Sequence, residues 1–397
     1  MTERITRQEF YQYHYPFQKL EDVLTSCGDE LANYEFAVEG STSSGDVIYK
    51  RYISAKNASE LKAAVLACPG IMTFHFGAIY DGIPSRHALK SRPVRRPLSF
   101  DLDLTDYDWL DLKDEHGIVC AALCDHAYPV SASSVFILQY ILTAGFNFSN
   151  FLLVYSGRRG VHLHVFDESA MRLDDEARSA IVKYINASFT KNGYRTTADV
   201  RKVMVMHKLR DAVYFSFEEI LIGDMDLFGS SSARVDFVNR MEIRHEALAT
   251  LAEDMVDQES GRDAWNYLKM RVMAIPLYWL KERLDDTVLA YVWPRLDANV
   301  SKSLNHLTKV PFACHGKSGR VAVSIDLYDY YRFKPGDVPS LDCFSTIDLD
   351  KAKTHFRVGI APGMKDVEDL VEATTLVTPR PLPRKFAFKA KRSPLGR

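Results

Sequence analysis

Two aspartates, Asp101 and Asp103, stand two positions apart in the otherwise apolar run LSFDLDL, residues 98–104. In an extended strand, alternate side chains share a face about 7 Å apart, so both carboxylates project from one side and the leucines from the other. Such like charges repel unless a cation lies between them, and Mg²⁺ and Mn²⁺ take carboxylate oxygens together with substrate phosphates. The pair therefore indicates a divalent-cation site. The alternative is a solvated strand edge, because Asp-x-Asp is short and also occurs in nucleotide-sugar transferases.

A second group of polar residues forms the segment SGRRGVH at 156–162. Two glycines flank Arg158 and Arg159, so the backbone of this turn can approach an anion while the guanidinium groups reach it. His162 and His164 then share one face of the strand that follows. The segment is typical of a phosphate-binding turn, and the alternative is a basic hairpin tip exposed to water.

A third group lies in RLDANVSKSLNHLTKVPFACHGKSGR, residues 295–320. It begins with one acid and continues with bases, which suits a polyphosphate bound through a metal ion. The acid is Asp297, and the bases are Lys302, Lys309, His315, Lys317 and Arg320. The GKS at 316–318 does not make a P-loop, because the earlier glycine that this motif requires is Pro311.

Strands and turns must position these groups. Alternating and apolar runs predict strands at 46–55, from 71 to Gly77, at 98–105, on both sides of the turn in 151–168, and at 319–326. Helices are predicted at 9–36, at 58–67 and at 131–145, the last with serine caps and a C-terminal glycine. A basic, proline-broken loop is expected at 89–97.

The pattern changes along the chain and predicts an α/β core interrupted by a helical insert. We expect a first core part at 1–168, a helical insert at 169–290, a second core part at 291–378 and a disordered basic tail at 379–397. The tail has seven basic residues, four prolines and no acid.

Composition limits the possible classes of protein. The chain has 397 residues, 47% of them hydrophobic, and a formal net charge of -2, which excludes a uniformly basic nucleic-acid coat. Six scattered cysteines favour a reducing compartment over a disulfide framework. No run approaches the roughly 18 consecutive apolar residues of a membrane span, and no secretory signal is evident. We expect an intracellular protein without a membrane partner.

Taken together, the three segments resemble the small, catalytic subunit of archaeo-eukaryotic DNA primase, and are closer to the eukaryotic type. The matching pieces are FDLDLTDYD, VYSGRRGVHLHVFDE and PRLDANVSKSLNHLTKVPFACHGKSGRVAVSID, with weaker matches in YQYHYPFQKL, DVIYKRY and FGAIY. The resemblance implies an α+β primase (prim) fold, with a mixed β-sheet catalytic core and an inserted helical subdomain. It also implies synthesis of short RNA primers from ribonucleoside triphosphates on single-stranded DNA, by two-metal nucleotidyl transfer, for the initiation of DNA replication.

The same resemblance assigns roles residue by residue. The catalytic, metal-binding carboxylates, for two Mg²⁺ or Mn²⁺ ions, would be Asp101, Asp103 and Asp297. The nucleotide-binding residues would be Tyr49, Arg51, Ser156, Arg158, Arg159, His162, Lys309 and His315.

One region departs from the family pattern. Family members carry a small zinc-binding knob, usually of cysteines, before the SGRRG turn, whereas this chain has DEHGIVCAALCDHAYPV there. His116, Cys120, Cys124 and His126 could form a Cys₂His₂ zinc site, although their spacing is unusual. The alternative is that zinc was lost and that the two cysteines pack as small apolar residues.

The resemblance further implies partners and a location. The expected partners are the primase large subunit and the replicative DNA polymerase alpha complex, and the expected location is the nucleus. One alternative is a catalytically inactive subunit of the same fold that binds nucleic acid or a partner. A glycosyltransferase is the other, and it leaves residues 295–320 unexplained.

Overall fold

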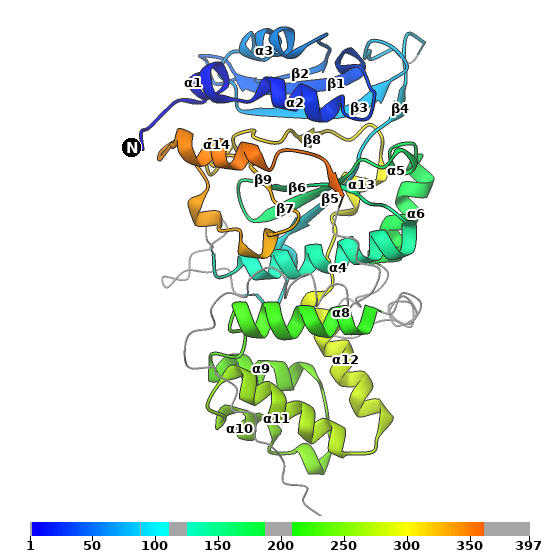
Figure 1. Ribbon diagram of the computed structural model, residues 1–397, viewed down its shortest axis with the longest axis vertical. Helices are drawn as coiled ribbons and strands as arrows, with labels where there is room; N and C mark the ends of the chain where they lie inside the picture. Colours follow the sequence, from blue (N-terminus) through cyan, green and yellow to red (C-terminus); the bar gives the residue numbers. More distant parts are fainter. Residues whose placement is uncertain (1, 88, 111–124, 187–208, 361–397) are drawn as a thin grey trace, which may run out of the picture.

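The computed structural model describes residues 2–87, 89–110, 125–186 and 209–360. It is elongated, with two β-sheets stacked above a group of helices along the long axis (Figure 1). The first sheet contains β1 (Tyr34–Ser41), β2 (Val47–Ile53), β3 (Thr73–Tyr80), β4 (Pro93–Arg95) and β8 (Thr308–Lys309). The second contains β5 (Leu98–Asp103), β6 (Asn150–Tyr155), β7 (Gly160–Val165), β9 (Ser324–Ile325) and β10 (Gly359–Ile360).

Helices cover both sheets and continue below them. In the sheet region they are α1 (Arg7–Glu9), η1 (Phe10–His14), α2 (Phe17–Leu24), η2 (Leu31–Asn33), α3 (Ala58–Leu66), η3 (Leu104–Asp106), α13 (Ala298–Lys302), η6 (Tyr330–Arg332), η7 (Pro335–Asp337) and α14 (Thr346–Thr354). The others are α4 (Tyr128–Phe146), α5 (Glu168–Met171), α6 (Asp175–Asn186), α8 (Leu209–Phe215), η4 (Ser216–Asp224), α9 (Ser231–Arg240), η5 (Glu246–Leu248), α10 (Leu251–Val256), α11 (Gly261–Ala274) and α12 (Tyr278–Val292).

The α+β class and a helical part inserted between core strands are confirmed. The sheets differ from the expected mixed sheet, because every described strand pairing is antiparallel and the strands form two sheets with orders β2-β1-β3-β4 and β10-β6-β7-β5. The reason is local. Strands β1–β2 and β6–β7 follow each other closely and pair directly, which only antiparallel neighbours can do through short turns.

Strand β5 lies at the edge of the second sheet, and a later part of the chain covers its free side. Asp101 pairs with His162 across the β5–β7 ladder, and Asp103 pairs with Gly160. On the other side, the N–H of Asp297 donates to the carbonyl of Asp101, and the Ser301 hydroxyl donates to the carbonyl of Ser99. The edge strand is therefore closed by the segment that carries the third aspartate.

Lysine 309 connects the two sheets. It lies in β8, opposite His75 of β3 in the first sheet, while its ammonium group donates to the carbonyl of Ser156 at the end of β6 in the second (3.1 Å). Chain segments from both sheets therefore meet at the SGRRG turn.

Helix α4 is the central helix of the core. By length and composition alone it could cross a membrane, since its mean hydropathy is 1.4. The sequence did not predict this, because no run of about 18 consecutive apolar residues occurs in it. However, 78% of that window is buried inside the protein, between the second sheet and α8 (Figure 1). The expected serine and glycine caps are wrong: the helix begins after Ala127 with a proline in its first turn and ends at Asn147 in the left-handed conformation.

Four other expectations need correction. The helical pattern at 9–36 ends early, since β1 begins at Tyr34. Strand β3 continues past Gly77 to Tyr80, and this glycine serves close packing instead, because a Cβ there would lie 2.7 Å from Leu307 Cδ2. The strand expected at 319–326 is reduced to Ser324–Ile325, and the loop at 89–97 contains the short strand β4.

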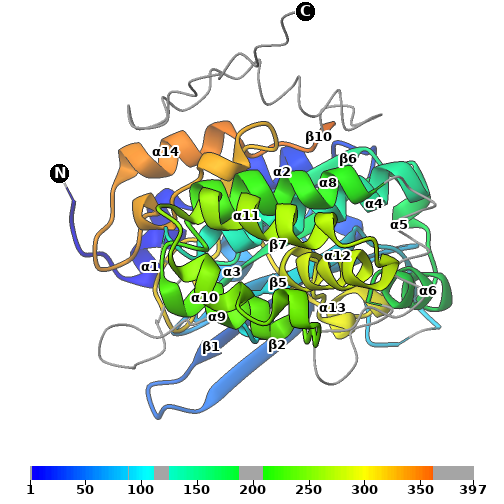
Figure 2. The ribbon, with the colours of Figure 1, turned by 90° about the horizontal axis from the view of Figure 1, so that it is seen from below.

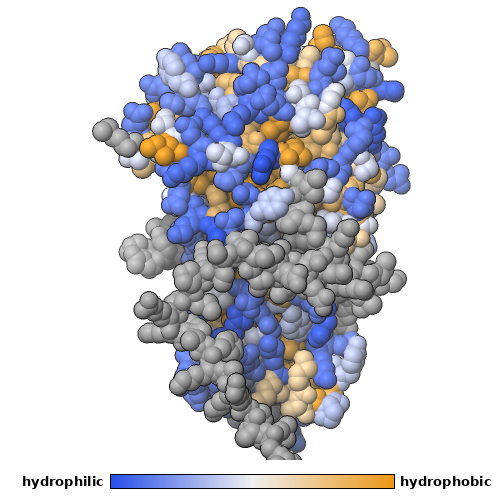
Figure 3. Space-filling model, in the orientation of Figure 1, coloured by the Kyte–Doolittle hydropathy of each residue, from blue (hydrophilic) through white to orange (hydrophobic). Residues whose placement is uncertain are grey.

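The face of the sheet region that Figure 3 draws is mainly polar. Seen from below, the β1–β2 hairpin extends beyond the helices (Figure 2). The face in Figure 3 is mainly hydrophilic over the sheets, with isolated apolar side chains between. The apolar side chains of β5, Leu98, Phe100 and Leu102, are at most 1% exposed.

Candidate active site

The three aspartates meet at the C-terminal end of β5. The backbone hydrogen bond from Asp297 to Asp101, 3.2 Å long, brings the third carboxylate beside the first two. One oxygen of Asp103 accepts the N–H and the hydroxyl of Thr105, each at 2.9 Å, and one oxygen of Asp297 accepts the N–H of Asn299 at 2.9 Å as the N-cap of α13. These local bonds fix the backbone from which both side chains project.

The carboxylates repel one another. Burial raises the pKa of Asp101 to about 7, with further contributions from the charges of Asp103 and Asp297 and an opposing one from Lys309. A divalent cation would remove this repulsion, whereas a purely structural role would leave it uncompensated.

Histidine 162 stands directly across from Asp101. Its Nε2 lies 3.7 Å from an oxygen of Asp101, which is too far for a hydrogen bond. Burial, with Lys309 as the next cause, lowers the pKa of His162 to about 3, so the imidazole is neutral. Its Nδ1 is buried and has no hydrogen-bond partner in the part of the chain that the structure describes.

The SGRRG turn joins β6 to β7 beside the aspartates. Gly157 has a φ of +84°, and a Cβ there would lie 2.9 Å from His315 Cβ, so this position needs glycine. The Ser156 hydroxyl oxygen accepts the N–H groups of Arg158 (3.3 Å) and Gly160 (3.2 Å), which leaves its proton to donate outward. The Nε atoms of Arg158 and Arg159 are buried, and neither has a partner among the described residues.

Two further basic residues face this turn. Burial lowers the pKa of Lys309 to about 8, with Asp101 opposing that shift, so the ammonium group is largely charged at neutral pH. The Nδ1 atom of His315 accepts the backbone N–H groups of Lys317 and Ser318 at 3.2 and 3.3 Å. Its Nε2 therefore carries the proton, and burial together with Lys309 and Arg158 lowers the pKa of this imidazole to about 3.

Tyr49 and Arg51 lie on β2 of the other sheet. The Arg51 guanidinium is already engaged, because its Nε and Nη2 donate to the two oxygens of the fully buried Glu35 at 2.8 and 3.1 Å. It also reaches the carbonyl of Asn305 at 3.4 Å, next to the segment that carries Lys309. Tyr49 is 52% exposed, and its phenol lies near Arg51.

Sequence reasoning missed residues of the first sheet that border the site. His75 lies opposite Lys309, and burial, followed by Lys309 and His306, lowers its pKa to about 4. Its Nδ1 is buried without a partner in the described ranges. The alternation of Thr73, His75 and Gly77 within the predicted strand was the available signal, but nothing in the sequence paired that strand with Lys309.

The donor set fits a hard divalent cation, although it is not closed around one. Among the described residues, no three His, Cys, Asp or Glu side chains are arranged to hold a metal ion. The three carboxylates are nonetheless suitable ligands for such a cation, because the charges of Asp103 and Asp297 lie close enough to raise the pKa of Asp101. Of the possible zinc ligands, His116, Cys120 and Cys124 lie outside the described residues, and His126 is exposed just before α4.

Comparison with known proteins adds an independent observation. The family model "DNA primase small subunit" matches residues 100–327. The DNA primase small subunit of Schizosaccharomyces pombe is 30% identical over 358 residues, covering 85% of this chain and 76% of that protein. The chain belongs to the DNA primase small subunit family.

Other members of this family show how wide the likeness is. The DNA primase small subunit of Drosophila melanogaster is 29% identical, over 75% of this chain and 70% of that protein. An archaeal DNA primase small subunit, from Thermococcus kodakarensis, is 27% identical over 57% of this chain and 62% of that protein. The stretch matched by the primase family model contains the three aspartates, the SGRRG turn, Lys309 and His315, but not Tyr49 or Arg51.

Proposed function

We propose that this chain is the nucleotidyl-transferring subunit of a primase, which synthesises short RNA primers from ribonucleoside triphosphates on single-stranded DNA to initiate replication. The observation that carries the proposal is the hydrogen bond from Asp297 to Asp101, which sets three carboxylates beside a turn whose serine and arginine groups are of the type that binds phosphate. Family membership supports the same assignment.

The residues divide the reaction between them. Asp101, Asp103 and Asp297 would hold two Mg²⁺ or Mn²⁺ ions, which supply charge neutralisation at the triphosphate and lower the barrier to attack. A primer 3′-hydroxyl attacks the α-phosphorus and gives up its proton to water. The new O–P bond forms as the bond from the α-phosphorus to the oxygen that bridges to the β-phosphate breaks, and pyrophosphate leaves.

Groups of this chain would orient the triphosphate. The Ser156 hydroxyl oxygen already accepts two backbone N–H groups, and Nδ1 of His315 accepts two others. The O–H of Ser156 and the Nε2–H of His315 therefore remain as donors, and the Lys309 ammonium group adds a positive charge. Arg158, Arg159 and His162 each have a buried nitrogen with no partner in the described ranges. Such preorganised donors stabilise the charge that develops on the leaving pyrophosphate.

Tyr49 and Arg51 are proposed to border the bound nucleotide. Because Glu35 holds two nitrogens of Arg51, the guanidinium is fixed in position and contacts a nucleotide through its remaining N–H groups.

A zinc site of His116, Cys120, Cys124 and His126 also stays a proposal. Metal analysis of purified protein checks it: close to one zinc per chain, lost in His126→Ala, supports the site. Absence of zinc after purification without chelators contradicts it.

The primase large subunit and a DNA polymerase alpha complex are the proposed protein partners, in the nucleus. Pull-down of each with the full chain, and localisation of a tagged chain, are the direct measurements.

The alternative is a catalytically inactive subunit of the same fold, which binds nucleic acid or a partner. One observation favours it, namely that the region where family members carry a zinc-binding knob has the sequence DEHGIVCAALCDHAYPV in this chain. Extension of a short RNA on a DNA template with Mg²⁺ or Mn²⁺ separates the two. Ribonucleotide addition that requires the divalent cation supports the proposed activity. No addition by the folded chain, even with the large subunit present, supports the alternative.

A further inference from the structure

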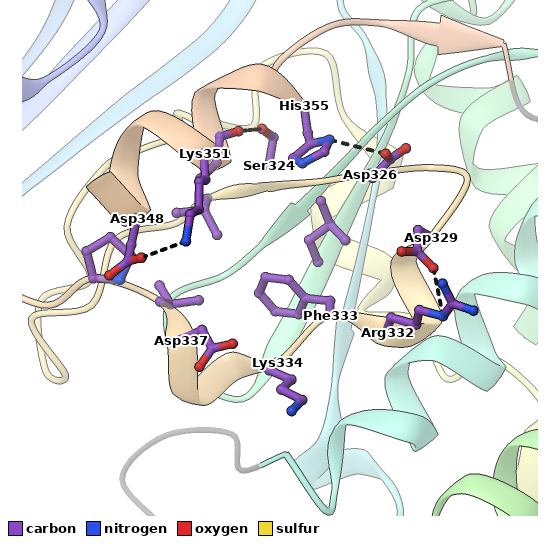
Figure 4. Close-up of a pocket in the computed structure, with 15 residues that line it drawn as sticks. Ser324, Asp326, Asp329, Arg332, Phe333, Lys334, Asp337, Asp348, Lys351 and His355 are labelled. Carbon is purple, nitrogen blue, oxygen red and sulfur yellow. Dashed lines mark hydrogen bonds and ion pairs between the residues drawn. The ribbon is translucent and has the colours of Figure 1, made fainter. Parts of the chain in front are cut away.

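A pocket of about 490 Å³ lies between β9, the turns η6 and η7, and α14 (Figure 4). None of the candidate active-site residues lines it. Its apolar lining consists of Val323, Ile325, Phe333, Val338, Pro339 and Ala352. The ring of Phe333 projects into the middle of the pocket and is only half-buried (Figure 4).

The polar lining of this pocket is weakly acidic. Its lining holds four aspartates and three cations, which gives a formal charge of -1 with His355 neutral. Three of these aspartates already pair with a basic side chain inside the pocket: Asp326 with His355, Asp329 with Arg332 and Asp348 with Lys351 (Figure 4). Beside the pocket, Asp125 accepts the N–H of Gly336 at 2.8 Å and adds a further negative charge. Asp337 lies exposed at the rim.

The pocket is physically connected to the candidate phosphate-binding turn. Phe333 contacts the ring of Tyr155, with 5.7 Å between ring centroids, and the Tyr155 hydroxyl donates to the carbonyl of Arg158 at 2.9 Å. A second connection runs through Arg320, whose guanidinium donates to the carbonyl of Pro335 and whose own carbonyl accepts the N–H of His315. An occupant that presses on Phe333 therefore acts on the groups that would hold a triphosphate.

The chain itself leaves the described part of the fold beside this pocket. After α14 it enters β10, where a Cβ on Gly359 would lie 3.2 Å from Leu327 Cδ1, two residues beyond Ile325 of the lining. The segment 379–397 follows after 18 more residues, which reach roughly 60 Å when extended. It contains seven basic residues and no acid, and the sequence KFAFK places Phe386 and Phe388 between lysines.

We propose that the pocket is a docking site for residues 379–397 of the same chain, with Phe386 and Phe388 packed on Phe333 and the flanking basic residues at Asp337 and Asp125. A tethered segment has an effective concentration near the millimolar range, so a weak intrinsic affinity suffices to fill the site. Docking is correspondingly reversible, and a single-stranded nucleic acid competes for the same basic residues.

Docking also affects the SGRRG turn, and this effect alone rests on the proposed function. With the pocket filled, Phe333 is held against Tyr155 and the carbonyl of Arg158 stays fixed. Nucleotide affinity is then higher in the docked state, by the reciprocity of coupled sites.

Photo-crosslinking in the full chain tests docking without any need for activity. p-Benzoylphenylalanine is placed at Phe386, the protein is irradiated in the absence of DNA, and crosslinked peptides are mapped by mass spectrometry. The expected crosslinks join residue 386 to residues 323–355 within one chain. Crosslinks elsewhere, crosslinks only between isotopically distinct copies, or none at all would overturn the proposal.

Charge reversal supplies matched controls. Asp337→Lys at the pocket rim should abolish the crosslink, whereas Asp342→Lys, an exposed aspartate outside this pocket, should leave it intact. Equal crosslinking in both variants would overturn the assignment of the pocket. For the coupling, Phe386→Ser/Phe388→Ser should weaken binding of a fluorescent ribonucleotide by roughly 5-fold. Unchanged nucleotide affinity with an intact crosslink in the wild type would refute the coupling and leave the docking established.

Discussion

The backbone N–H of Asp297 donates to the carbonyl oxygen of Asp101, with 3.2 Å between the two atoms. This bond seats a residue of the second core part on the edge of β5, where Asp103 is already in place. The arrangement costs stability, because burial and the neighbouring carboxylates raise the pKa of Asp101 to about 7. Such strain is expected where a site is built for a ligand and not for the fold alone.

Asp101→Asn should separate activity from stability. The amide keeps the shape but removes a charge, so we expect metal-dependent ribonucleotide addition to fall by roughly 100-fold or more. In chelator, the thermal midpoint should stay level or rise, because the repulsion with Asp103 and Asp297 is relieved. Primer extension and thermal unfolding of the same preparation measure both. Asp211→Asn, at an exposed position of α8 outside the aspartate cluster, is the control, and equal losses in the two variants would contradict the assignment of Asp101.

Tyr155→Phe should change nucleotide affinity more than turnover. The variant removes only the hydroxyl that donates to the Arg158 carbonyl at 2.9 Å. A hydrogen bond of this kind contributes about 1 kcal/mol, so KM for the ribonucleotide should rise roughly 5-fold while kcat changes little. Tyr34→Phe, which removes a comparable buried bond to the carbonyl of Leu24 (2.8 Å), should lower stability and leave KM alone. A rise in KM in both variants would show a general effect of destabilisation.

Much of the second sheet was predictable from the sequence. Period-two alternation identifies β5, and glycines at 157 and 160 mark the turn between β6 and β7. Ser99 shows the limit of that reasoning. Period-two alternation places it on the same, polar face as Asp101, yet it is 1% exposed and hydrogen-bonds to the buried His164 at 2.8 Å. Alternation assigns a face to a side chain but does not reveal what later packs on that face.

The parts of the site that depend on long-range pairing were not predictable. Lys309 of β8 pairs with His75 on the neighbouring strand β3, and its ammonium group donates to the carbonyl of Ser156 in the other sheet. No local pattern of the sequence predicts either contact. The same holds for Glu35, whose partner Arg51 was expected to serve a nucleotide alone. Strand registers between distant segments follow from the packing of the whole domain, which single-sequence periodicity does not contain.

Removing Arg51 should damage the fold as well as the site. Glu35 is fully buried, and Arg51→Met would leave its carboxylate with only the Tyr80 hydroxyl as a side-chain donor among the described residues, at 3.1 Å. Breaking one side of a buried pair costs about 3–5 kcal/mol. The double variant Arg51→Met/Glu35→Gln should be less destabilised than Arg51→Met, as measured by urea unfolding. If the double variant is less stable than Arg51→Met, the charge of the Glu35 carboxylate does not need Arg51 to compensate it.

His75 should make the protein sensitive to mild acid. Burial, with Lys309 and His306 adding to it, lowers the pKa of His75 from its ordinary value of 6.5 to about 4. Between these two values the unfolded chain binds the extra proton and the folded chain does not. The contribution of this residue is therefore complete above pH 6.5 and is lost as the pH falls toward 4. At pH 5 the loss relative to pH 7 is about 2 kcal/mol in the free energy of unfolding.

His75→Gln removes this titration, so the difference in urea-unfolding free energy between pH 7 and pH 5 should shrink by about that amount. The variant needs comparison with its own value at pH 7, because the substitution also changes packing beside Lys309. His87→Gln, at an exposed position, should keep the full acid sensitivity of the wild type. An unchanged pH dependence in His75→Gln would mean that His75 is protonated in the folded protein. Neither burial nor the charge of Lys309 would then lower the pKa of this imidazole in the folded protein.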